Sequence, residues 1–268
     1  MMEKLIVVRH SERLDEVDQR QWNKIVEKKF AHSHDSHARF CFGSDPPITS
    51  NGVVLSRDAA ATVLEIIKAN PSAEKRVVLY SSKLLRCVQT CYEIATQLKL
   101  PMHVSTGLAL TAAAVESCVS AKHGRSNSFN FLSLEEIQAH CPRTTVHCCD
   151  DENSSHYIPM NHWRDAMNAV NEHNRIHTPH VKDNEAICCI NIVVAHRETI
   201  RNLLNRHLKL PYCCIAMFDI QHSDSSESAD ETIPESLSTE LRSELTSIHP
   251  TLQPILKKKF VFLRLMDR

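Results

Sequence analysis

Two arginines and a histidine follow the first apolar segment of the chain. Arg9 and His10 come directly after the apolar run at residues 5–8, and Arg13 lies three positions after His10. A neutral imidazole can attack phosphorus, and the guanidinium fork matches the oxygens of a phosphate group. An Arg-His pair after a strand is more often a surface turn, so this motif alone is a weak indication of catalysis.

Two further segments place similar residues after apolar runs. Arg86 follows the run at residues 76–80 and lies in the first turn of an expected helix, where backbone N–H groups also favour an anion. His196 follows the run at residues 191–195, and residues 45–52 are expected to form a loop and helix N-cap. Together these segments predict an anion site built from several parts of the chain.

Short β-rich runs alternate with longer amphipathic ones along the sequence. We expect strands at residues 5–8, 76–80, 102–104 and 191–195, and helices at residues 51–69 and 82–98. This order predicts an α/β fold with three αβα layers and a mostly parallel central sheet. Functional groups in such folds lie at the carboxyl ends of the strands, which is where three of the candidate segments begin.

Length and composition are those of an ordinary globular protein. The 268 residues fit one α/β domain spanning 1–268, and 42% are hydrophobic. A formal net charge of -1 argues against a nucleic-acid footprint or a polybasic membrane patch, so an anion site must be a local cluster. The N-terminal apolar run is too short for a signal peptide, and no later run could span a bilayer, so we expect a cytoplasmic protein.

Two polar insertions interrupt this pattern. One covers about residues 14–42, and the other is acidic and Ser-rich at about residues 222–253. Both are expected to be surface excursions, the second with the composition of a mobile loop. A last strand is expected at residues 260–264.

Neither a metal nor a cofactor is expected. His32, His34 and His37 are closely spaced but have no second cluster, so we interpret them as part of a solvated loop. The chain has 4 glycines, and the sequence contains neither a Walker loop nor a GxGxxG phosphate-binding motif. The 11 cysteines contain no CxxC pair and lie mostly in apolar segments, which favours buried thiols.

Taken together and in order, the motifs resemble those of the histidine phosphatase superfamily, whose fold is that of the phosphoglycerate mutases. The matching features are the Arg-His pair after the first strand, the loop from Asp45 to Gly52, Arg86 with Gln89 and Thr90, and the late His196. Within the superfamily, the pattern around Arg13 and Arg86 is similar to the suppressor-of-T-cell-receptor-signalling proteins and the ecdysteroid-phosphate phosphatases. The segment at residues 133–136 also resembles a helix start in that branch.

The resemblance implies a role for each matching residue. His10 would be the nucleophile that forms a phosphohistidine, which water later hydrolyses. Arg9, Arg13 and Arg86, with His196, would surround the phosphoryl oxygens and stabilise the charge that spreads over them. The alternative is that these arginines only form surface ion pairs with neighbouring carboxylates.

The chain departs from the family at the residue that protonates the leaving oxygen. Family members supply a Glu or Asp after the third strand, whereas alignment on Gly107 puts Leu110 in that place. General acid catalysis is worth about 10²–10⁴-fold, so its loss should affect alkyl phosphates most. Glu116 is a candidate substitute, although an exposed Glu is more often merely solvated. Ser11 and Arg197 replace two family glycines and are expected to crowd the pocket, or in the case of Arg197 to add a cation.

Two hypotheses follow from these observations. The first is a divergent phosphatase that acts weakly, through His10, on a phosphorylated small molecule or a phosphotyrosine-type ligand. The second is a pseudophosphatase that binds such a ligand or serves as a scaffold without turnover. A homodimer is one candidate assembly, and the sequence does not choose between the hypotheses.

Overall fold

The computed structural model describes residues 2–71, 74–108, 129–149, 188–204, 208–220 and 260–261. The strands are β1 (Met2–Arg9), β2 (Lys75–Ser82), β3 (Met102–Ser105), β4 (Val146–Cys148), β5 (Cys188–Ala195), β6 (Ile215–Ile220) and β7 (Phe260–Val261). The α-helices are α1 (Leu14–Val17), α2 (Gln19–Lys29), α3 (Ser36–Gly43), α4 (Ser50–Ala69), α5 (Leu85–Leu98), α7 (Leu134–His140) and α9 (Arg197–Leu204). A short 3₁₀ turn, η1 (Thr106–Leu108), follows β3.

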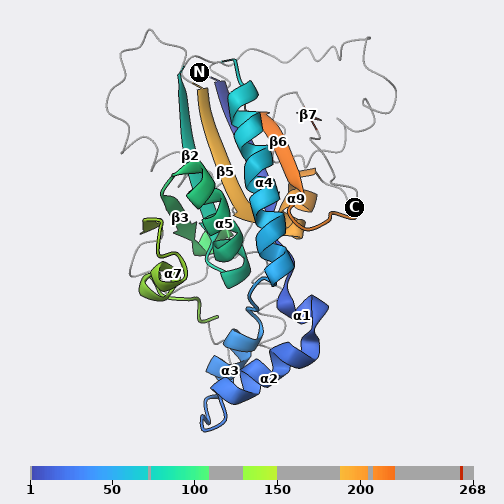
Figure 1. Cartoon of the computed structure of the whole chain (residues 1–268), viewed down its shortest axis with the longest axis vertical. Helices are drawn as coiled ribbons and strands as arrows, with labels where there is room; N and C mark the ends of the chain where they lie inside the picture. The colour runs from blue at the N-terminus through green and yellow to red at the C-terminus, as the bar shows by residue number, and fades with distance from the viewer. Residues whose placement is uncertain are drawn as a thin grey trace, which may run out of the picture.

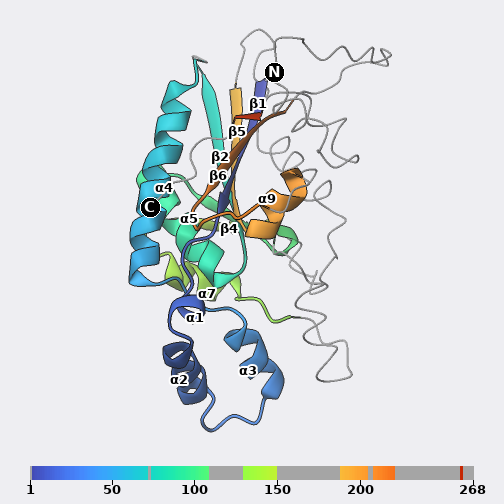
Figure 2. The same cartoon turned by 90° about the vertical axis from the view of Figure 1, so that its right-hand side faces the viewer.

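The described strands form one sheet in the order β4-β3-β2-β5-β1-β6-β7. The five strands from β4 to β1 are parallel, whereas β6 is antiparallel to β1 and β7 is antiparallel to β6. Helices α4 and α5 lie on one face of the sheet and α9 lies on the other (Figures 1 and 2). The predicted three-layer α/β fold with a mostly parallel sheet is therefore confirmed.

Alternation along the central strands builds a core on each face of the sheet. In β1, Ile6 and Val8 pack with residues of α4 and α5, while Leu5 and Val7 pack on the opposite face with Ile200 of α9. Successive side chains of a strand point to opposite faces, so strands covered on both faces are continuous apolar runs. This is why β1 and β5 could be located from sequence.

The predicted elements agree with the structure in position, with one clear error at the start of α5. The helix was expected from Ser82 but begins at Leu85. Ser82 is the last residue of β2, and its Oγ accepts a hydrogen bond from the N–H of Leu84, which ends the strand in a tight turn. The helix start expected at residues 133–136 is present. Ser133 and Glu136 form a reciprocal capping box there, at the beginning of α7.

The polar segment at residues 14–42 is helical and has its own small apolar cluster. Trp22 and Val26 of α2 are buried, and the Trp22 ring lies 5.2 Å from the Phe42 ring. The Trp22 indole N–H donates to the carbonyl of Gly43 at 2.9 Å. The solvated-loop interpretation of the nearby histidines holds for His32 and His34, which are exposed, but is wrong for His37, which lies in α3.

Two expected elements lie partly or wholly outside the described residues. The acidic segment at about residues 222–253 is among those that the structure does not describe. Of the expected last strand at residues 260–264, Phe260 and Val261 are described and form β7.

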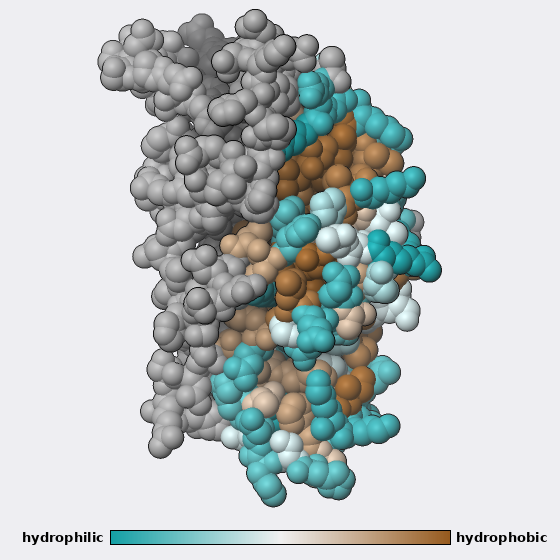
Figure 3. Space-filling view, turned by 90° about the vertical axis from the view of Figure 1, so that its left-hand side faces the viewer, coloured by the Kyte–Doolittle hydropathy of each residue, from teal (hydrophilic) through white to brown (hydrophobic). Residues whose placement is uncertain are grey.

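The face shown in Figure 3 mixes hydrophilic and hydrophobic residues, and the hydrophobic ones are most concentrated in its upper part. Among the described residues, no helix is both long and apolar enough to cross a membrane.

Gly52 allows α4 to begin close to the segment that follows His10. A Cβ at this position would lie 2.8 Å from the Glu12 carbonyl oxygen and 3.1 Å from the Ile48 Cβ. We expect Gly52→Ala to lower the free energy of unfolding by about 1–3 kcal/mol, because backbone atoms must move to accept the methyl group. Urea denaturation measures this change.

Gly43→Ala is the matched control for that substitution. The nearest atoms to a Cβ at Gly43 are the methyl groups of Val26, 3.8 and 3.9 Å away, which is ordinary contact. Equal unfolding free energies for the two alanine variants would contradict the close approach at Gly52.

Candidate active site

His10 follows β1 and is buried at the centre of the candidate site. Its Nδ1 lies 2.8 Å from the carbonyl oxygen of Ser11. A carbonyl only accepts, so Nδ1 carries the hydrogen and Nε2 keeps its lone pair in the neutral ring. Burial lowers the pKa of His10 well below its ordinary value, and the charge of Arg86 acts in the same direction. His10 therefore has the protonation state that a nucleophile requires.

His196 follows β5 and lies beside His10. The two ring centroids are 5.4 Å apart in an edge-on arrangement. The Nε2 of His196 is 3.2 Å from the Ser82 Oγ and 3.6 Å from the Cys87 Sγ. Burial, followed by the charge of Arg86, lowers the pKa of His196 well below its ordinary value. Both histidines are thus uncharged in the described structure.

The strand order explains why these residues meet. The strands β2, β5 and β1 are adjacent and parallel, and Arg9 is level with Ala195 in the register. Their carboxyl ends therefore bring His10, His196 and the start of α5 to one edge of the sheet, as the sequence predicted.

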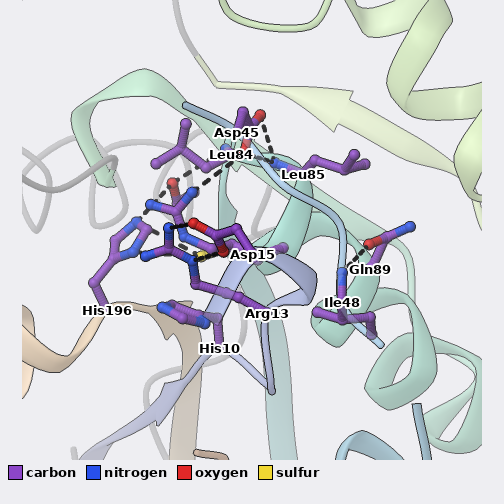
Figure 4. A network of polar contacts seen from close by, with 12 residues as sticks. His10, Arg13, Asp15, Asp45, Ile48, Leu84, Leu85, Gln89 and His196 are labelled. Atoms are coloured by element: carbon purple, nitrogen blue, oxygen red, sulfur yellow. Dashed lines mark hydrogen bonds and ion pairs between the residues drawn. The ribbon is translucent and has the colours of Figure 1, made fainter. Parts of the chain in front are cut away.

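Arg86 enters the site from the first turn of α5 and is fixed by Asp45. Its Nη1 lies 3.3 Å from Asp45 Oδ1, and the Asp45 carboxylate also accepts from the Leu85 N–H at 2.9 Å (Figure 4). Both side chains of the ion pair are nearly inaccessible to solvent. Burial raises the pKa of Asp45 to about 6, although the neighbouring Arg86 opposes that change. Asp45 therefore positions Arg86, whereas its sequence context indicates only a loop.

Arg13 is held by two carboxylates of α1. Its Nε and Nη2 bind the two Asp15 oxygens at 2.9 and 2.5 Å, and its Nη1 lies 3.1 Å from Glu16 Oε1. Figure 4 shows Asp15 in the same group of side chains as Arg13, His10 and His196. Part of the ion-pair alternative is therefore observed at Arg13, although both side chains of the pair are largely buried rather than on an open surface.

Arg9 lies against Tyr212, whose ring centroid is 6.0 Å from that of His10. Its guanidinium carbon is 4.2 Å from the centre of the Tyr212 ring, and its Nη1 donates to the Leu210 carbonyl. Tyr212 also donates its hydroxyl hydrogen to Glu16, which links this side of the site to α1. Burial lowers the pKa of Arg9, with smaller opposing contributions from Tyr212 and Glu16.

Two buried donors of the cation cluster have no acceptor among the described residues. These are the Nε–H groups of Arg9 and Arg86. A buried donor without a partner costs about 1–3 kcal/mol. An anion that accepted a hydrogen bond from either group would remove its cost.

The loop before α4 forms hydrogen bonds with Glu12, which follows His10, and with Gln89 of α5. Thr49 Oγ1 donates to Glu12 at 2.6 Å and accepts from the Gly52 N–H, while Gln89 accepts from the Ile48 N–H at 2.8 Å. These contacts hold the loop against α5, so Glu12 and Gln89 have structural roles here.

The side chains of Ser11 and Arg197, which were expected to crowd the site, have hydrogen-bond or ion-pair partners in the chain. Ser11 is buried, and its Oγ donates to the Gly52 carbonyl at 2.6 Å, so the side chain points toward α4. Arg197 is about half exposed and pairs with Glu198 at 3.0 Å. The expectation of crowding is wrong for Ser11, because its side chain is engaged by Gly52. Arg197 agrees with the alternative expectation of an added cation, because its charge acts on Arg9.

The two positions considered for the proton donor lie in the segment that follows β3. Ser105 and Thr106 are described, but Leu110 and Glu116 lie outside the described residues. Within the part of the chain that is described, no group of three or more His, Cys, Asp or Glu side chains could hold a metal ion.

Comparisons with known proteins identify the fold. Residues 5–109 match the model of the histidine phosphatase superfamily, branch 1. The solved structure of the ecdysone phosphate phosphatase from Bombix mori, in complex with tungstate, superposes with a TM-score of 0.52 at 16% identity, covering 88% of this chain and 96% of that one. The chain has the histidine phosphatase fold.

A more distant likeness is to a phosphoserine phosphatase from Entamoeba histolytica, with a TM-score of 0.36 at 17% identity, covering 82% of this chain and 92% of that one. We base the fold assignment on the Bombix mori structure and the family match. A search of curated protein sequences finds no match. The histidine phosphatase resemblance drawn from the motifs is thus confirmed, whereas the roles of individual residues remain predictions.

Proposed function

We propose that this histidine phosphatase-like chain binds phosphomonoesters at the carboxyl edge of β1 and β5 and hydrolyses them slowly through a phosphohistidine. The observation that carries the proposal is the neutral His10, whose Nδ1 is fixed on the Ser11 carbonyl so that Nε2 is free to attack. The unpartnered Nε–H groups of Arg9 and Arg86 support an anionic ligand beside it.

The chemistry would proceed in two displacements. The Nε2 lone pair forms a bond to phosphorus as the bond to the ester oxygen breaks, and that oxygen leaves with the electron pair. Water then attacks phosphorus and the P–N bond breaks, which returns His10 and releases phosphate. Fixed arginines stabilise the charge that spreads over the phosphoryl oxygens in both steps.

The substrate preference should follow from the missing acid. With Leu110 where the family has a carboxylate, the leaving oxygen must depart without a proton from that position. A phenolate is a much weaker base than an alkoxide, so aryl esters, phosphotyrosine-type groups included, suit this site better than alkyl esters.

Parallel assays of para-nitrophenyl phosphate and glycerol phosphate between pH 5 and 7 test this function. We expect slow turnover of the aryl ester and about 10²–10⁴-fold lower kcat/KM for the alkyl ester, which is the usual worth of a general acid. Equal turnover of both esters would mean that a proton donor is present and would overturn the proposed preference.

A second candidate function is that of a pseudophosphatase that binds without turnover. It is favoured by the ion pairs of Arg13 with Asp15 and of Arg86 with Asp45, which already compensate two of the cations. Calorimetric binding of tungstate together with no hydrolysis of either ester would select this function instead.

A further inference from the structure

The cation cluster around His10 is electrically balanced by the chain itself. Arg9, Arg13 and Arg86 supply three positive charges, and three carboxylates contact or face them: Asp15, Glu16 and Asp45. Arg197, whose charge reaches Arg9, shares the Glu198 carboxylate with Arg201. Among Arg9, Arg13, Arg86 and these three carboxylates, the positive and negative charges are therefore equal in number.

The three carboxylates differ in how firmly they are held. Asp45 is buried and accepts from the Leu85 N–H as well as from Arg86, so it belongs to the framework of the site. Glu16 accepts from the Tyr212 hydroxyl and is about half exposed. For Asp15, no partner other than Arg13 is found among the described residues, and its side chain is only 15% exposed.

Asp15 occupies the part of Arg13 that a phosphoryl group would use. Its two oxygens accept from Nε and Nη2, which is the bidentate geometry in which a guanidinium binds phosphate. The charge of Asp15 also reaches Arg86: burial lowers the pKa of Arg86, while the charges of Asp45 and Asp15 oppose that change. The Asp15 carboxylate thus acts on two of the three arginines.

We propose that Asp15 is a built-in counter-anion that a phosphoryl group must displace from Arg13, so that Asp15 sets the affinity of the pocket for anions. The inference rests on the proposed function, because it concerns the same pocket. On this proposal, Arg13 is not an arginine that is already free to bind phosphate, because Asp15 must first release it. Asp15 satisfies the Arg13 fork in the described structure, and the fork becomes available when Asp15 leaves.

Calorimetric titration with tungstate tests the proposal without requiring turnover. We expect Asp15→Asn to bind tungstate about tenfold tighter or more at pH 7, because the variant removes a competing negative charge close to the ligand. Glu27→Gln is the control, since it removes one carboxylate from an exposed position of α2 and should bind as the wild type does.

A double-mutant cycle of Asp15 and Arg13 shows whether Asp15 competes with the anion for Arg13 or only holds Arg13 in position. Arg13→Ala should weaken tungstate binding less than about threefold in the wild type, where Asp15 already holds the arginine, but about tenfold or more in Asp15→Asn. Unchanged or weaker binding by Asp15→Asn would overturn the proposal, since it would show that Asp15 merely orients Arg13. Failure of both wild type and Asp15→Asn to bind would instead refute the phosphate pocket, and with it the proposed function.

Discussion

Replacing His10 with alanine is expected to reduce kcat/KM for para-nitrophenyl phosphate by about 10³-fold or more, because the variant lacks the nucleophile on which both displacements depend. Tungstate binding should persist, because Arg9 and Arg86 remain in place. Steady-state kinetics and calorimetry on the same preparations measure the two quantities.

Two further variants test whether the loss of activity is specific to the His10 imidazole. His10→Gln retains a polar side chain in the buried position, and it should be as inactive as the alanine variant. His34→Ala removes an exposed histidine and should keep wild-type activity. Hydrolysis that survives in a folded His10→Gln variant would exclude His10 as the phosphoryl acceptor.

Arg86→Ala is expected to have a large effect on stability as well as on ligand binding. The substitution leaves the buried Asp45 without its counter-charge, which costs about 3–5 kcal/mol when one member of a buried pair is removed. It should also weaken tungstate binding by about 30-fold or more, the cost of truncating a charged hydrogen-bond partner in a buried site. Urea denaturation and calorimetry measure the two effects.

The stability loss should depend on pH through Asp45. Burial already raises the pKa of Asp45 to about 6 with Arg86 present, and without Arg86 the pKa should rise further. A carboxyl group whose pKa is higher in the folded than in the unfolded state contributes stability below its unfolded pKa of about 4 and loses it as the pH rises through the folded pKa. The penalty of Arg86→Ala should therefore be smaller at pH 5 than at pH 7.5.

The double variant Arg86→Ala with Asp45→Asn separates the structural role of the pair from ligand binding. Removing the unpaired charge should recover much of the lost stability, whereas tungstate binding should stay weak. Recovery of binding in the double variant would contradict the assignment of Arg86 to the anion site.

Much of the fold and the meeting of the main site residues could be predicted because they follow from local rules. The continuous apolar runs of β1 and β5 indicate strands buried on both faces, and the carboxyl ends of adjacent parallel strands lie at one edge. Residues placed directly after such runs, His10 and His196, therefore had to come together. The position of Arg86 followed from its place in the first turn of the next helix.

Other parts of the site depend on contacts that spacing does not encode. The pairing of Asp45 with Arg86 requires the path of a loop 41 residues earlier in the chain. The contact of Asp15 with Arg13 requires a helix to start directly after Arg13, within a segment whose polar composition indicated only a surface excursion. The side chain of Ser11 was expected to crowd the pocket, because its hydrogen bond to the distant Gly52 could not be foreseen.

The most direct test of the account is to find the phosphoryl group on the chain during turnover. The wild type would be mixed with para-nitrophenyl phosphate, quenched in alkali to preserve phosphohistidine, digested, and mapped by mass spectrometry. Our account predicts phosphate on His10 in the wild type and none at this position in His10→Gln. Phosphate on another residue, or turnover without any phosphorylated histidine, would contradict it.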